Sequence, residues 1–374
     1  MDTRNQLQNK NSRNSSMELL KIIAIIFIVL SHSMPDGDVN TYNSAIDIEL
    51  GCNIQIIIIQ IMHNLGQIGN DIFLVCSCWF LLDDNSVKGE KIARLFGDAF
   101  FVSVVSLIIF TLAGYQFPVK YFIEQFIPIL SGNSWFLSCY ILLYAVHPFL
   151  NIVINKLSKR QLCSMSTCLF IMYCCIYFVL RNIGFYYSQI IGFITIYFVT
   201  AYLKKYLIKL IKNNSLLLVI VCAICMFAVN LMSNYIVIKT GVGLYSRWNT
   251  FNNPLFLIIA FGTLGIALKR NFTNKVVNYI SGLSLLIYIT HTNRIIRDYV
   301  RFDFFQFILE NYTYSNLLGW CFVYFVVSLV YGIVFSLIYK FLFEKVMNKI
   351  SMVVYRFTSV IWNKTMNVIS NISE

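Results

Sequence analysis

A histidine lies inside the first long apolar stretch of the chain, where an ionisable ring is costly. The stretch runs from Met17 to His32, and Lys21 lies eleven residues before the histidine. Eleven residues make nearly three helical turns, so Lys21 and His32 share one helix face, about 16 Å apart along the axis. Glu18 falls near the same face. Ionisable groups within a bilayer usually mark function, although Lys21 could simply snorkel to the interface and His32 could hydrogen-bond in a bundle.

A second polar stripe lies in the last third of the chain. Ser281, Ser284, Tyr288 and His291 follow the spacing i, i+3, i+7 and i+10, which places them on one face of a helix. Such a face could bind a hydroxylated acceptor or polarise a carbonyl group. Hydrogen bonding between helices is the alternative interpretation.

A third stripe follows Trp135, a residue type that favours the outer membrane interface. Tyr140, Tyr144, His147 and Asn151 recur on one helix face behind it. For these four side chains we expect packing rather than chemistry. Trp135, at the outer end, is a candidate for binding a substrate.

Two smaller groups complete the candidates. Asp71, at the expected outer start of a second span, could face His32 and orient or neutralise its ring. Lys91 and Arg94, in an expected inner loop, could hold the phosphates of a nucleotide-bearing donor. The bias of basic residues toward the inner side explains the same pair without any ligand.

Composition places these residues in a membrane protein. The 374 residues are 58% hydrophobic and 12% charged, whereas soluble domains carry about 25% charge. The net charge of +12 is spread in small clusters between apolar runs, as the positive-inside rule predicts, and does not indicate nucleic acid. The 11 cysteines lack zinc spacing, so we expect no metal and interpret them as small buried hydrophobes. Phosphate-loop and esterase motifs are missing.

The expected fold is an all-α bundle of about ten transmembrane helices with both termini cytoplasmic. Basic clusters at 88–94, 156–160, 204–212 and 269–275 then fall on the inner side. The candidate spans are residues 17–34, 66–82, 98–117, 134–153, 162–180, 186–203, 215–234, 254–268, 279–299 and 317–343.

Three segments lie outside this count. Residues 1–16 form a polar cytoplasmic N-terminus ahead of the membrane domain at 17–343. Residues 46–62 are expected to form an outer re-entrant or interfacial helix, because a further span would move the later basic clusters outside. The tail at 344–374 alternates apolar and basic residues, which predicts either an amphipathic helix on the inner leaflet or a frayed polar tail.

Five stretches in chain order, within roughly residues 15–300, carry a family resemblance. They are Lys21 with His32, Gly69-Asn-Asp71-Ile-Phe, Lys91-x-x-Arg94, Trp135-Phe-Leu-x-x-Tyr140 and Ser284-x-x-x-Tyr288-x-x-His291. Together they resemble the acyltransferase-3 family of integral membrane acyltransferases. The chain departs from the family pattern with Lys21 where arginine is commoner, and with Cys78 where glycine is usual.

The resemblance implies a multi-pass enzyme of the bacterial cytoplasmic membrane. It would move an acyl group, usually acetyl, from acetyl-CoA to a hydroxyl of a cell-surface or capsular polysaccharide or its lipid-linked precursor. His32 would act as general base or acyl carrier, supported by Lys21, Glu18 and Asp71. Lys91 and Arg94, with Lys21, would hold the donor. The alternative from another class is a polyprenyl-linked glycan transporter or polymerase.

Overall fold

The computed structural model describes residues 14–34, 54–132, 134–176, 178, 188–240, 248–251, 253–311 and 316–372. Most of these residues are helical and no strand occurs among them, which confirms the all-α membrane bundle. The longer helices are α2 (Ser15–His32), α4 (Ile54–Leu81), α5 (Gly89–Leu112), α7 (Trp135–Lys156), α8 (Lys159–Leu169), α10 (Gln189–Tyr202), α11 (Ile208–Thr240), α13 (Pro254–Leu268), α16 (Arg301–Asn311), α17 (Leu317–Ile338) and α18 (Glu344–Ile372). Shorter ones are α6 (Val119–Phe126), α14 (Lys275–Ser281) and α15 (Ser284–His291).

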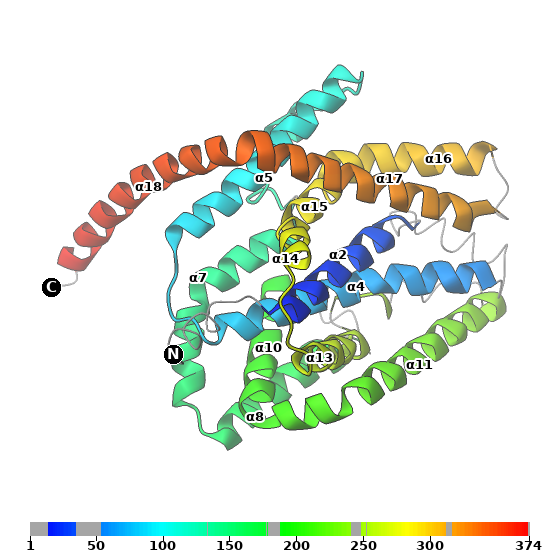
Figure 1. The fold of residues 1–374 in the computed structure, drawn as a ribbon, viewed down its shortest axis with the longest axis horizontal. Helices are drawn as coiled ribbons and strands as arrows, with labels where there is room; N and C mark the ends of the chain where they lie inside the picture. The colour runs from blue at the N-terminus through cyan, green and yellow to red at the C-terminus, as the bar shows by residue number, and fades with distance from the viewer. Residues whose placement is uncertain are drawn as a thin grey trace, which may run out of the picture.

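Helix α2 runs through the middle of the bundle (Figure 1), where it contacts α4, α13, α14, α15 and α17. Two glycines of α4 allow close contact with it. A Cβ on Gly66 would lie 2.3 Å from the Ser31 Oγ, and one on Gly69 would lie 2.6 Å from the Ala24 carbonyl oxygen. Small residues let helix backbones approach closely in membranes. The ionisable face of α2 is therefore surrounded by other helices.

Helix α4 corrects the predicted second span and the predicted re-entrant segment. Residues 54–62 form no separate helix, because α4 continues without a break from Ile54 to Leu81; residues 46–53 lie outside the described residues. The polar residues between the two apolar runs look like a loop in the sequence. In the structure Gln60 donates to Asn234 (2.6 Å) and Asn64 to Asn230 (3.3 Å), both on α11.

Other span boundaries also differ from the prediction. Helix α5 begins at Gly89, so Lys91 and Arg94 lie in its first two turns rather than in a loop. The expected inner loop at 204–212 is helical, since α10 continues through a π-helical turn, Leu203–Leu207, into α11. The expected ninth span, 279–299, is divided among α14, α15 and a further π-helical turn, Ile296–Val300.

Five helices of the described chain are long and apolar enough to cross a bilayer, with Pro254–Leu268 as a shorter apolar helix. The count of ten spans thus stays a prediction.

The ends that the sequence assigns to the cytoplasm lie together in the structure. The Lys204 ammonium pairs with Asp83 after α4 at 2.7 Å, and Lys205 donates to the Ile154 carbonyl at the end of α7 at 3.3 Å. The Ser16 hydroxyl, at the start of α2, donates to the Arg270 carbonyl after α13 at 2.8 Å. These helix ends form one face of the bundle, which we call the basic face.

Helix α18 follows α17 through the π-helical turn Tyr339–Phe343 and packs on α5. Arg94 of α5 forms an ion pair with Glu344 at its first residue. Further along, Ser351 and Tyr355 pack against Gly97 and Gly89 of α5, and beyond them the end of α18 extends away from the other helices (Figure 1). Exposed apolar residues such as Val353, Phe357 and Trp362 fit the predicted amphipathic tail helix; its place on the inner leaflet remains a prediction.

Candidate active site

The last residue of α2, His32, faces the last residue of α15, His291. The His32 Nδ1 and the His291 Nε2 lie 3.0 Å apart, and the ring centroids are separated by 5.1 Å. The two residues are 259 positions apart in the chain. Both stand at the ends of their helices, at the end of α2 that points away from the basic face.

The hydrogen bonds assign the proton on each ring. The His291 Nδ1 lies 2.8 Å from the Ile287 carbonyl oxygen, and a carbonyl only accepts, so this nitrogen carries a proton. In a neutral His291 the Nε2 is then the acceptor, and it receives the proton of the His32 Nδ1. The basic lone pair of His32 is thereby placed on Nε2. This nitrogen is the one suited to accept a proton or to attack a carbonyl carbon.

Both histidines line a small cavity of about 60 Å³. Its wall combines aromatic rings, hydroxyl groups and two guanidinium groups. The lining residues are Val29, His32, Ser33, Trp135, Tyr288, His291, Thr292, Ile296, Arg297, Arg301, Tyr324 and Ser328. Trp135 and Tyr288, predicted from separate stripes, meet in this wall, and the Tyr288 ring stands edge-on to His291 with centroids 5.9 Å apart.

The sequence analysis did not single out the two arginines of this wall, Arg297 and Arg301. Arg301 is 8% exposed, and its Nη1 donates to the His32 carbonyl oxygen at 3.2 Å. The Arg297 Nε donates to Asp298 at 2.7 Å. Basic residues in a loop at the end of a span are explained by topology alone, but the i, i+4 spacing of this pair shortly after His291 places both on the same helix face.

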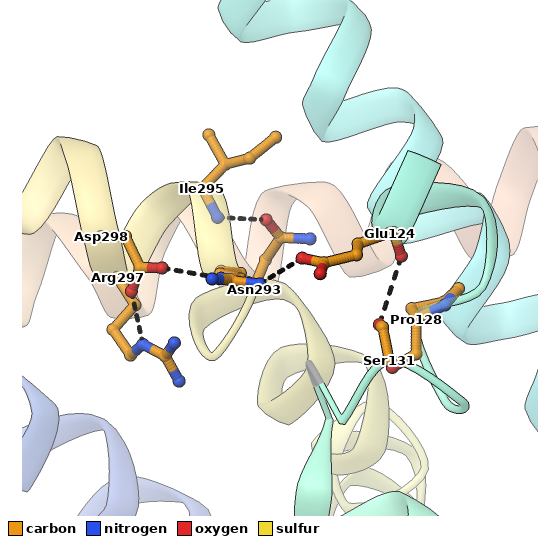
Figure 2. A network of polar contacts seen from close by, with 8 residues as sticks. Glu124, Pro128, Ser131, Asn293, Ile295, Arg297 and Asp298 are labelled. Atoms are coloured by element: carbon orange, nitrogen blue, oxygen red, sulfur yellow. Dashed lines mark hydrogen bonds and ion pairs between the residues drawn. The ribbon is translucent and has the colours of Figure 1, made fainter. Parts of the chain in front are cut away.

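A network of charges supports the segment that carries these arginines. Figure 2 shows Glu124 of α6 reaching toward the turn that holds Arg297 and Asp298. Arg294 forms ion pairs with Glu124 and, at 2.9 Å, with Asp298, and its guanidinium lies 4.7 Å above the Tyr121 ring. Burial raises the pKa of that Tyr121 phenol well above its ordinary value. The network fixes the short helix α6 against the wall of the cavity.

The opposite end of α2 holds a second polar group. The Lys21 ammonium pairs with Glu18 at 3.2 Å, and Ser281, the last residue of α14, donates its hydroxyl to the other oxygen of that carboxylate. Lys21 also lies 5.4 Å from the centre of the Phe80 ring. The two polar stripes predicted from the sequence therefore meet at both ends, Ser281 with Glu18 and His291 with His32. Between them, the Ser284 Oγ is buried without a hydrogen-bond partner in the described residues.

Lys91 and Arg94 point to different neighbours. The Lys91 ammonium donates to the Tyr140 hydroxyl at 3.1 Å and lies 4.1 Å above the Tyr144 ring. Arg94 is engaged by Glu344. The Lys91 ammonium therefore contacts two tyrosine side chains near the basic face, and the structure does not bring Lys91 and Arg94 together at one anion site.

Asp71 lies away from the cavity. Because α4 begins at residue 54, Asp71 is in mid-helix and not at the outer start of a span. It is fully buried, its oxygens lack a hydrogen-bond partner among the described residues, and its electrostatic neighbour is Cys174. The structure does not bring it to His32.

The third stripe packs, as its sequence suggests. The Asn151 amide donates to the Leu81 and Asp84 carbonyl oxygens (3.0 and 2.9 Å) and accepts from Tyr197 (2.6 Å). It thereby closes the end of α4. The Ser86 hydroxyl and amide hold the pKa of the neighbouring Asp84 carboxyl below its ordinary value. No group of three or more His, Cys, Asp or Glu side chains in the described part of the chain could hold a metal.

Comparison with known proteins identifies the family. No curated protein and no solved structure gives a match. A family model described as an acyltransferase domain, that of the acyltransferase-3 family, matches residues 14–357. The match includes both ends of α2, the paired histidines and the wall of the cavity. The chain belongs to the acyltransferase-3 family and is a multi-pass membrane acyltransferase.

Proposed function

We propose that the protein transfers an acetyl group from acetyl-CoA to a hydroxyl of a surface or capsular polysaccharide, or of its lipid-linked precursor, at a bacterial cytoplasmic membrane. One observation carries the proposal: a histidine whose basic Nε2 is set by a second histidine lines a cavity at the end of α2. Trp135 adds an aromatic face and Tyr288 a hydroxyl, which suit a sugar.

In this mechanism the His32 Nε2 takes the proton of the acceptor hydroxyl as its oxygen attacks the thioester carbonyl carbon. The carbon–sulfur bond breaks, and the CoA thiolate recovers the proton from His32. The same nitrogen could carry the acetyl group between donor and acceptor. A rapid quench with labelled acetyl-CoA and no acceptor separates the two routes, since only the second labels the protein.

The donor would approach from the basic face. Lys91, seated on Tyr140 and Tyr144, would contact the phosphates of CoA as a point charge. Lys21 lies on the α2 face that leads from there to His32, about 16 Å further along. Glu18 and Ser281 fix the direction of the Lys21 side chain. Arg94 would contribute less, because Glu344 already engages it.

The test replaces His32 with alanine in membranes that hold equal amounts of protein. Transfer of label from acetyl-CoA to surface glycan should fall by about 10² to 10⁴-fold, the range of general acid–base catalysis. His63→Gln is a matched control, since His63 lies at a similar depth on α4 but faces Asn249, at 3.1 Å. Undiminished transfer in His32→Ala would refute the assignment. Membranes that use no acetyl-CoA at all would favour the glycan transporter or polymerase.

A further inference from the structure

A second, larger cavity lies between α5, α18 and the turn that follows α6. Its volume is about 670 Å³, within the range of about 300–1,000 Å³ that ligand sites usually have. The lining is apolar apart from three hydroxyl groups on α18, and no charged side chain belongs to it among the described residues. On α5 the lining extends from Gly89 to Phe100, about 16 Å along the helix. We call this cavity the α5–α18 groove.

The groove opens toward the lipid that surrounds a membrane protein. Two of its lining residues, Leu130 and Val354, are 75% and 52% exposed. An apolar hollow of this size is not left empty in a bilayer, because its wall would lose van der Waals contacts. A hydrocarbon chain is the ligand that such a wall accepts.

One wall of the groove adjoins the cavity that holds His32. This wall is the turn formed by residues 126–130. Ser138, in the first turn of α7, donates to the Ile129 carbonyl oxygen of this turn at 2.8 Å. Trp135, three residues before Ser138, lines the cavity. The groove and the cavity are therefore joined by the first turn of α7.

The same wall is held in place by polar contacts. The Ser131 hydroxyl donates to the Glu124 carbonyl oxygen at 3.3 Å (Figure 2). The Glu124 carboxylate in turn pairs with Arg294, which follows His291 by three residues. The position of the groove relative to the paired histidines is thus fixed, and a ligand that occupies both sites meets two preformed surfaces.

We infer that the acyl acceptor is a sugar still attached to a polyisoprenoid carrier, whose chain lies in the α5–α18 groove while the sugar lies beside Trp135. The inference rests on the proposed function and narrows its substrate class to the lipid-linked precursor. Chains already in a bilayer gain no hydrophobic free energy from the groove. A chain joined to a sugar that the cavity binds is held there at a high effective concentration, which a free phospholipid is not. The methyl branches of a polyisoprenoid can also pack between branched and aromatic side chains such as Ile92 and Phe96.

The first experiment follows the acetyl group in membranes that acetylate their own glycan. After a short pulse of labelled acetyl-CoA, lipids are extracted with chloroform and methanol and then treated with mild acid, which releases sugars from polyprenyl phosphates but not from diacylglycerol. Most of the early label should enter the extract, and mild acid should make it water-soluble.

The second experiment locates the chain, with protein amounts matched. Ala93→Phe fills the groove from α5 and Val354→Trp fills it from α18. Each should slow the entry of label into the extract at least about fivefold, which corresponds to about 1 kcal/mol of carrier binding, and leave the KM for acetyl-CoA within about twofold. Ile108→Phe is the matched control, because Ile108 is 53% exposed on the same helix outside the described lining, and it should keep the wild-type rate.

A photolabel separates binding from damage to the fold. Polyprenyl phosphate with a diazirine on its chain, added to the purified protein in phosphatidylcholine nanodiscs, should label peptides of α5 and of residues 126–130. The label should be lost in Ala93→Phe and Val354→Trp and kept in Ile108→Phe. Excess unlabelled polyprenyl phosphate should displace it, and excess phosphatidylglycerol should not.

Several results would overturn the inference. They are early label confined to carrier-free glycan, extracted label that resists mild acid, wild-type rates in both filled variants, and photolabelling that phosphatidylglycerol displaces equally well, which would assign the groove to an ordinary phospholipid. Membranes that incorporate no label into any fraction would instead contradict the proposed function. Photolabelling needs no acetyl-CoA, so the two failures are distinguishable.

Discussion

The His291 side chain should set the rate of transfer without binding either substrate. Its Nε2 accepts the His32 proton at 3.0 Å, and one such net bond stabilises an arrangement by about 1 kcal/mol. Losing that bias lowers the ratio of the tautomer with the lone pair on Nε2 to the other tautomer by about fivefold, so the reactive fraction of His32 falls by at most that factor. A ring that also rotates loses alignment, which costs up to about 10²-fold. We therefore expect His291→Ala to reduce kcat by about 10 to 10²-fold.

The assay follows CoA release and glycan acetylation in membranes, with protein amounts matched. The KM for acetyl-CoA should stay within about twofold, because His291 lies at the far end of α2 from the basic face. His291→Gln should recover much of the rate, since its Oε1 can accept from the His32 Nδ1 near the position of the lost nitrogen. A full kcat in His291→Ala, or a glutamine variant as slow as the alanine variant, would refute the positioning role.

Three further changes test the surrounding structure. Gly69→Ala should lower the free energy of unfolding by about 1–3 kcal/mol, measured as a lower melting temperature in detergent, because its Cβ would meet the Ala24 carbonyl oxygen at 2.6 Å. Gly319→Ala should cause no such loss, because its Cβ would meet nothing within 4 Å. Lys91→Gln should raise the KM for acetyl-CoA several-fold in steady-state assays and Arg94→Gln less, because only Arg94 is held by a carboxylate; equal increases would show that the ion pair opens for the donor. Asp71→Asn should change kcat by no more than about threefold and should leave the pH dependence of kcat unaltered, since Asp71 lies away from the cavity. A large loss of kcat would show that Asp71 acts with the catalytic residues.

Sequence patterns predicted which residues belong to the site better than they predicted which of these residues contact one another. Helical spacing alone placed Lys21 with His32, and Ser281 with His291, each pair on one face. That the two faces meet depends on a contact across 259 positions, which no local pattern contains. Asp71 was misplaced for a related reason. Its depth depends on where α4 starts, and the polar residues that hide this start are paired with Asn230 and Asn234 of another helix.

The arginines of the cavity wall show a different limit. A cluster of basic residues near a span end is explained by topology, so Arg297 and Arg301 carry no separate signal in one sequence. Their place in the cavity wall emerges only when burial and direction are known. Lys91 and Arg94 make the opposite case. Their spacing suggests one anion site, while the structure divides them between Tyr140 and Glu344.

The segment from Ser281 to His291, which contains the break between α14 and α15, contacts both ends of α2. Over the ten residues from Ser281 to His291 a regular helix rises about 15 Å, whereas Glu18 and His32 lie about 21 Å apart along α2. The Gly282 and Leu283 amides donate to carbonyls three residues back, at 3.1 and 2.9 Å, and such 3₁₀ turns rise further per residue. The stretched segment and the long Glu18 side chain together make up the difference. One segment thus contacts both the carboxylate that pairs with Lys21 and the histidine that would meet the acceptor.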